Sequence, residues 1–115
     1  MLSSLYPMGL RGISLALYVL RHEHAADACP GAHPDYGPML LAHVDPSNAR
    51  ERYGVEIHGE AVLRGQHTLY MIVDSSDPAG LDGFLAPLRQ FGTAEAWPSS
   101  SCDAVVAGGG CTALA

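Results

Sequence analysis

The amino-acid sequence predicts one α+β domain in which helices cover one face of a four-stranded antiparallel sheet. The first observation is size, because 115 residues with 48% hydrophobic content suit a single small domain with a modest core. The second is order, because strand-like and helix-like segments follow one another as strand, helix, strand, strand, helix, strand. The third is the placement of proline, glycine and aspartate between these segments, where turns are expected.

The first predicted strand covers residues 13–22 (ISLALYVLRH), which are rich in leucine, isoleucine, valine and tyrosine and end in charge. Residues 25–37 (AADACPGAHPDYG) carry two prolines, two glycines and two aspartates and predict a loop. A helical stretch opens at Pro38, because proline is favourable at the first helical position. Residues 45–48 (DPSN) break this stretch and cap a second short helix that ends at Gly54.

Two further strands are expected to form a hairpin in the middle of the chain. Residues 55–63 (VEIHGEAVL) begin with alternating apolar and polar side chains, which is typical of a half-buried strand. Residues 64–66 (RGQ) make a hairpin-sized turn that contains glycine. Residues 67–74 (HTLYMIVD) are apolar on both faces, which predicts a central strand.

The last helix and strand of the domain have clear boundary signals. Asp77 is a suitable N-cap, Pro87 is expected to kink or end the helix near its own position, and Gly92 closes the segment. Residues 93–97 (TAEAW) predict a short fourth strand that stops at Pro98. The apolar residues of the helix recur at helical spacing and are Leu81, Phe84, Leu85 and Leu88.

This order of elements is that of the ferredoxin-like βαββαβ fold. Right-handed crossovers give the spatial strand order 4-1-3-2, with all neighbours antiparallel. One face of the sheet stays open, and a domain this small is expected to cover it with a second copy. The domain is predicted to span residues 13–98, after a disordered leader over 1–12 and before a tail rich in cysteine and glycine over 99–115.

Residues 54–98 carry the pattern of a known superfamily. A strand with a glycine hairpin is followed by an apolar strand ending in aspartate, a helix of the form DPxxLxxFLxPL, and a short strand followed by proline. This pattern resembles small bacterial domains of the dimeric α+β barrel superfamily, and in particular an uncharacterised family of stand-alone domains. The superfamily includes monooxygenases, isomerases and ligand binders. The resemblance therefore implies a homodimer with a pocket between sheet and helices, and implies no particular reaction.

The charge balance makes some partners unfavourable, and the lengths of the apolar runs bear on the compartment. The formal net charge is −6 and the chain has no lysine, so nucleic acid and anionic membranes are poor partners. No apolar run approaches the roughly 20 residues that span a bilayer. The apolar run before Arg21 is short for a signal peptide and is followed at once by charge. A cytoplasmic protein is therefore expected, and secretion is the lesser alternative.

The strand order brings several metal-binding residue types toward one end of the sheet. The end of the first strand carries His22 and His24, two residues apart and on the same face. This end lies beside the start of the third strand, which carries His67, and Cys29 follows on the adjoining loop. Imidazole and thiolate suit zinc first, and also copper or iron. The alternative is that polar residues simply collect at strand ends.

The tail adds two further cysteines. Cys102 and Cys111 follow the fourth strand, which ends at the opposite end of the sheet from His24. If the tail folds back or crosses to a partner subunit, then His24, Cys29, Cys102 and Cys111 make a closed structural zinc site. A disulfide between Cys102 and Cys111 and plain burial of Cys102 are alternatives.

Two other histidines are candidates for a pocket or for proton transfer. His43 follows Leu40 by three residues in the first helical stretch, so it faces either the core or the ligand pocket. His58 is expected to share a strand face with Glu56 and Glu60, as an acid–base pair or as an exposed ion pair. His22 and His67 are the other candidates for a ligand pocket.

Three functions follow, in this order. The first is a homodimeric domain that binds a small ligand or a metal through histidine and cysteine side chains of the first strand, its loop and the tail. The second is a cofactor-independent monooxygenase-like or isomerase-like enzyme, in which Tyr18, Tyr70, His43 or His58 handles protons. The third is a structural or regulatory subunit. The sequence has no nucleophile elbow, phosphate loop or dinucleotide motif, so it leaves open whether the protein is an enzyme.

Overall fold

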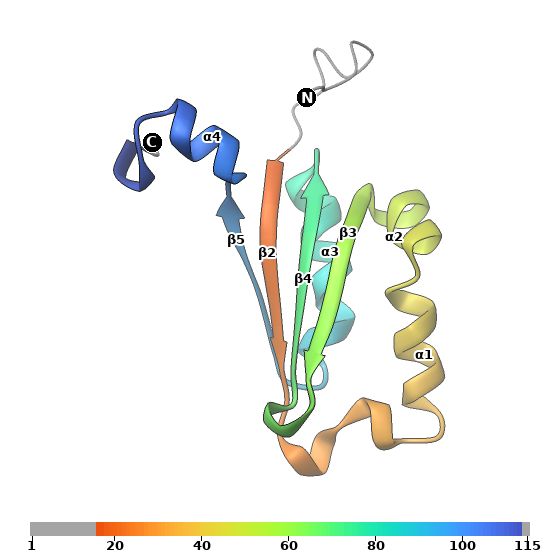
Figure 1. Cartoon of the computed structure of the whole chain (residues 1–115). Helices are drawn as coiled ribbons and strands as arrows, with labels where there is room; N and C mark the ends of the chain where they lie inside the picture. Colours follow the sequence, from red (N-terminus) through yellow and green to blue (C-terminus); the bar gives the residue numbers. More distant parts are fainter. Residues whose placement is uncertain (1–15, 114–115) are drawn as a thin grey trace.

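The computed structural model describes residues 16–113, and it contains a four-stranded antiparallel sheet (Figure 1). The strands are β2 (Ala16–Glu23), β3 (Val55–Leu63), β4 (Thr68–Ser75) and β5 (Thr93–Ser99). Their spatial order is β3-β4-β2-β5, and every neighbouring pair is antiparallel. The predicted strand order and the ferredoxin-like type of fold are therefore confirmed.

Within residues 16–113, four α-helices accompany the sheet, and the sequence contains signals for several of their ends. They are α1 (Tyr36–His43), α2 (Pro46–Tyr53), α3 (Pro78–Arg89) and α4 (Cys102–Ala107). Asp45 caps α2 by accepting from two backbone N–H groups, and Asp77 caps α3 in the same way from Ala79. Gly54 ends α2 with a left-handed φ of 67°, which glycine adopts without steric cost.

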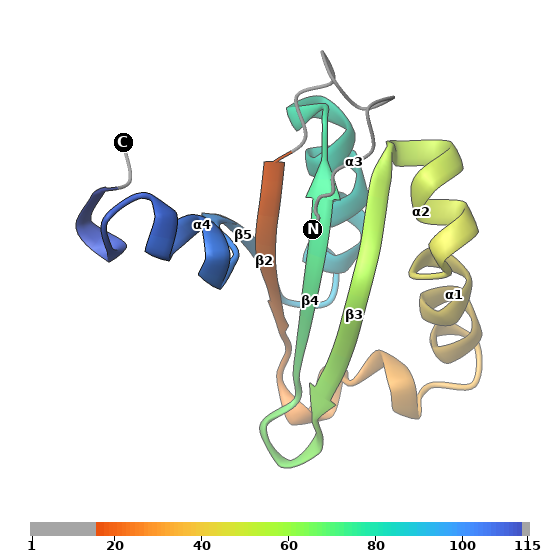
Figure 2. The same cartoon turned by 45° about the horizontal axis from the view of Figure 1, so that its top comes forward.

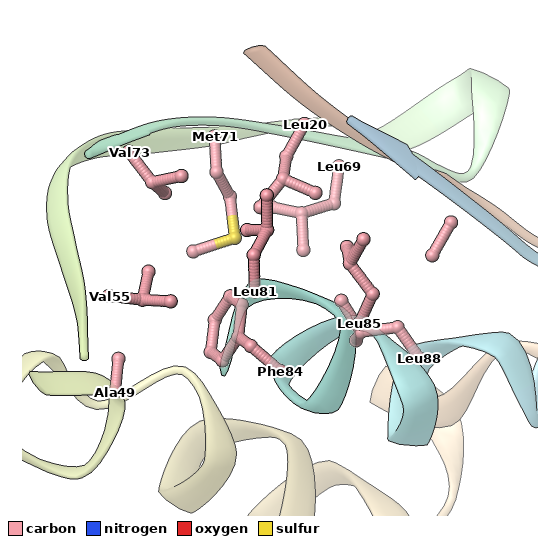
Figure 3. Packing of buried hydrophobic residues seen from close by; sticks show 11 residues of the cluster. Leu20, Ala49, Val55, Leu69, Met71, Val73, Leu81, Phe84, Leu85 and Leu88 are labelled. Carbon is pink, nitrogen blue, oxygen red and sulfur yellow. The ribbon is translucent and has the colours of Figure 1, made fainter. Parts of the chain in front are cut away.

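The hydrophobic core lies between one face of the sheet and α3 (Figure 3). Phe84 of α3 is fully buried, and Met71 and Val73 of β4 point from the sheet into the same core. Val55 and Ala49 extend the core toward α2. In Figures 1 and 2, α3 lies across the sheet, whereas α2 and α1 stand beside the edge strand β3. All four apolar residues expected on the buried face of α3 are buried.

The prediction that the last strand stops at Pro98 was wrong. Strand β5 continues through Pro98 to Ser99, and Pro98 pairs in register with Tyr18 of β2. Because β5 is an edge strand, a residue without a backbone N–H is tolerated there. The tail then forms α4, whose N-cap is Ser101, and it extends away from the sheet (Figure 2). The predicted leader over 1–12 lies outside the described residues.

The expected pairing of His58 with glutamate was also wrong. A β-bulge lies between Ile57 and Gly59, so His58 is an extra residue without a register partner on β4. After the bulge the faces are exchanged: Glu56 stands opposite Asp74, and Glu60 stands opposite the buried Met71. The bulge instead turns the His58 imidazole toward Asp74.

The second face of the sheet is not covered by any helix within residues 16–113 (Figures 1 and 2). Because side chains alternate along a strand, Tyr70 and Ile72 of β4 point away from the core and share this face with Trp97 of β5. Ile72 is 48% exposed and Trp97 is 42% exposed. We call the face that carries Tyr70, Ile72 and Trp97 the open face.

Among residues 16–113, no helix combines the length and apolar character needed to cross a bilayer.

Candidate metal centre

The end of β2 and the β3–β4 turn meet at one end of the sheet. The backbone N–H of His24 donates to the carbonyl oxygen of His67 at 3.2 Å. His67 itself has a left-handed φ of 50°, and among residues 16–113 it is the one non-glycine residue with positive φ. Histidine tolerates this conformation better than most residues do, and here it turns the chain from the hairpin turn into β4. The predicted neighbourhood of His24 and His67 is therefore confirmed.

Three side chains converge at this end of the sheet. His24, Cys29 and His67 each offer one ligand atom, and these atoms lie within 4.8 Å of one another. All three residues are half-buried, and Cys29 is a free thiol. Cys29 sits between two short 3-10 turns, Ala26–Ala28 and Pro30–Ala32, which fold the loop back beneath the strand end. This arrangement can hold a metal ion.

The ligand atoms are close enough for small side-chain movements to complete a metal site. Two nitrogens and a thiolate around a tetrahedral zinc ion are roughly 3.3–3.6 Å apart, given metal–ligand distances of about 2.0–2.3 Å. The ligand atoms here lie within 4.8 Å of one another, so each pair needs to close by about 1.5 Å at most, given those distances. Small rotations of partly exposed side chains provide a movement of this size.

A hydrogen-bonded chain fixes the proton on His24. Nδ1 of His22 lies 3.0 Å from the carbonyl oxygen of Thr93, and because a carbonyl only accepts, Nδ1 of His22 carries the proton. Nε2 of a neutral His22 is then an acceptor, and it lies 3.2 Å from Nδ1 of His24. Nδ1 of His24 is therefore the donor, which leaves a lone pair on Nε2 of His24.

Within residues 16–113, no donor forms a hydrogen bond to that lone pair. Nε2 of His24 is buried and has no hydrogen-bond partner among residues 16–113. Buried polar atoms are normally paired, and an exception calls for an explanation such as a missing ion. A lone pair on one ring nitrogen, with the other nitrogen held by a hydrogen bond, is the state in which histidine binds metals.

Electrostatics keep this lone pair unprotonated. Burial lowers the pKa of His22, and the hydrogen bond to the Thr93 carbonyl opposes this only in part. Burial also lowers the pKa of His24, with repulsion from the His22 and His67 imidazoles adding to the effect. Both rings are therefore neutral near pH 7, as metal binding requires.

Close packing of the α3–β5 turn holds the end of β2 in place. A Cβ atom on Gly92 would lie 2.9 Å from the Cα of His24 and would overlap the carbonyl oxygen of Glu23. Only glycine therefore fits between these strands at this point. The sequence marked Gly92 as the end of the helix, but its contact with His24 depends on the three-dimensional packing.

The two tail cysteines lie far from this cluster. The end of β5 pairs with the start of β2, through Ser99 and Leu17, and Figure 1 shows α4 at the opposite end of the sheet from the β3–β4 turn. Cys102 and Cys111 are both exposed and free, so they form no disulfide in this structure. Within one described chain, the set of His24, Cys29, Cys102 and Cys111 is not assembled, whereas His67 does join His24 and Cys29.

The other histidine candidates have different surroundings. Nε2 of His43 donates to the carbonyl oxygen of Phe84 at 2.7 Å, and its ring stacks on the Phe84 ring with centroids 4.8 Å apart. Nε2 of His58 lies 2.5 Å from a carboxylate oxygen of Asp74, which is 7% exposed. The sequence signal for Asp74 was weak, because an aspartate at the end of an apolar strand usually marks a turn.

Comparisons with protein-family models, curated proteins and solved structures gave no match to this chain.

Proposed function

We propose that this domain binds a transition metal ion, zinc before copper or iron, through His24, Cys29 and His67. The observation that carries the proposal is the unpartnered lone pair on the buried Nε2 of His24 beside a thiol and a second imidazole. Two imidazoles and one thiolate are borderline to soft ligands. Zinc and copper bind such ligands, whereas the harder calcium and magnesium ions prefer oxygen ligands.

A set of three protein ligands leaves one coordination position for water, a small molecule or a further side chain. Structural zinc sites are usually closed by four protein ligands, whereas catalytic sites keep such a position open. The prediction that Cys102 and Cys111 complete the site stays a prediction, and it requires the tail of a second copy. A thiolate ligand also favours a reducing compartment such as the cytoplasm.

Metal analysis of the untagged protein tests this proposal. We expect about one zinc ion per chain by elemental analysis. Cobalt loading is expected to give a thiolate-to-cobalt absorption band in the near ultraviolet. His67→Gln should lose most of the bound metal, whereas His33→Gln, which alters an exposed histidine outside the cluster, should keep it. Metal-free protein with three freely titrating thiols would contradict the proposal.

We also infer that two copies pair through the open face, as the resemblance to dimeric α+β barrels implies. The supporting observation is the set of exposed large side chains, Tyr70, Ile72 and Trp97, that share this one face of the sheet. Light scattering should then give twice the 12.1 kDa chain mass. Ile72→Glu should produce monomers, whereas Val62→Glu, on the other face of the sheet, should leave the dimer intact. A wild-type monomer at micromolar concentration would overturn this inference.

A further inference from the structure

Helix α1 is apolar but poorly packed, unlike α3. None of its eight residues is buried, and Met39 and Leu41 are 62% and 71% exposed. Methionine and leucine are usually buried in proteins, so their exposure on α1 is unusual. The apolar side chains of α1 are therefore available to contact a ligand.

A groove lies between α1, α2, and the C-terminal end of α3 with the residues that follow it. Its volume is about 490 Å³, within the range typical of small-molecule sites. Tyr36, Met39, His43, Pro87 and Phe91 supply most of its aromatic and apolar wall. No strand residue lines the groove, and it shares no residue with the metal centre.

The walls of the groove favour a flat ligand. The rings of Tyr36 and Phe91 meet edge to face with centroids 5.2 Å apart. The His43 ring is held by its hydrogen bond to Phe84 and by stacking, so it is a rigid part of the wall. Rigid aromatic walls bind planar apolar groups with little loss of side-chain entropy.

The charge in the groove favours an anion. The chain has 12 acidic residues against 6 basic ones, yet no aspartate or glutamate lines the groove. Arg52 lines it, and its guanidinium has no carboxylate partner within residues 16–113. The guanidinium carbon of Arg52 lies 5.8 Å from the ring centroid of Tyr53. A guanidinium without a partner beside an apolar wall suits a carboxylate with an apolar body.

We propose that this groove binds a small aromatic carboxylate, with Arg52 pairing to the carboxylate and Tyr36, His43 and Phe91 contacting the ring.

Titration with 2-naphthoate, followed by NMR of the whole chain, tests the proposal. We expect chemical-shift changes centred on Tyr36 and Phe91, and binding that is roughly tenfold weaker for the uncharged 2-naphthamide. Arg52→Gln should weaken 2-naphthoate binding by about the same factor and leave the amide unaffected. Arg50→Gln is the matched control, because Arg50 lies on the same helix, is exposed and does not line the groove.

Four results would each overturn the proposal, and the first three concern the wild-type protein. They are no binding of 2-naphthoate at millimolar concentration, equal binding of acid and amide, and shifts centred on the open face or on His24. Equal effects of Arg52→Gln and Arg50→Gln would also overturn it, because the protein's general charge would then account for binding. The groove and the His24, Cys29 and His67 cluster share no residue, so failure of metal binding would not contradict binding of 2-naphthoate in the groove.

Discussion

Nδ1 of His24 lies 3.2 Å from Nε2 of His22, and this contact decides which nitrogen of His24 is free. His22 is itself held by the carbonyl of Thr93, the first residue of β5. The backbone of the edge strand thus sets the proton position on His22 and, through it, on His24. In the proposed metal centre His22 is not a ligand, but its hydrogen bond would orient the ligand His24.

Replacement of His22 by phenylalanine should therefore weaken metal binding without removing a ligand. His22 is buried, and phenylalanine fills a similar volume but offers no acceptor to Nδ1 of His24. Loss of such a supporting hydrogen bond typically costs about 10–100-fold in metal affinity. Competition with a chromophoric zinc chelator measures this, with His33→Phe as the control at an exposed position. Unchanged affinity in His22→Phe would show that the contact has no role in the site.

The metal-free protein should lose stability as the pH falls below the ordinary pKa of histidine. The pKa values of His22 and His24 are lowered in the fold, so the unfolded chain binds more protons below about pH 6.5. The free energy of unfolding should then decrease from about pH 8 to pH 5.5. His24→Gln should show a smaller decrease in urea titrations, whereas His33→Gln should match the wild type. Identical pH dependence in all three proteins would contradict the lowered pKa values.

The His58–Asp74 pair should stabilise the bulged part of the sheet. His58→Ala leaves the buried Asp74 carboxylate without this partner, which should lower the free energy of unfolding by about 1–3 kcal/mol. Because the two residues act together, His58→Ala combined with Asp74→Ala should be less destabilising than the sum of the single changes. Glu60→Ala, at an exposed position on the same strand and opposite Met71, should change stability by less than about 0.5 kcal/mol. Additive effects would mean that the pair is not coupled.

The strand order and the contact between His24 and His67 could be predicted from the sequence, because both follow from topology. Two strands that are antiparallel neighbours must bring the end of one beside the start of the other. The convergence of Cys29 on this end was predicted only from its place on the adjoining loop. Two short turns determine where that loop folds.

Other features depend on packing that a linear pattern does not record. The bulge beside His58 shifts the register by one residue, and the alternation of Val55, Glu56 and Ile57 contains no sign of it. The proton position on His24 depends on a carbonyl of a strand that begins about 70 residues later. The prediction that Pro98 ends the strand was wrong, because proline is tolerated in an edge strand and the sequence does not show which strand lies at an edge.

The most direct test of the metal centre compares the three cysteines in one experiment. Cys29→Ser, Cys102→Ser and Cys111→Ser would each be purified without a tag and analysed for zinc alongside the wild type. We predict about one zinc ion per chain in the wild type and in the two tail variants, and almost none in Cys29→Ser. Equal zinc content in Cys29→Ser and the wild type, or a loss as large in Cys102→Ser or Cys111→Ser, would contradict a centre built on His24, Cys29 and His67.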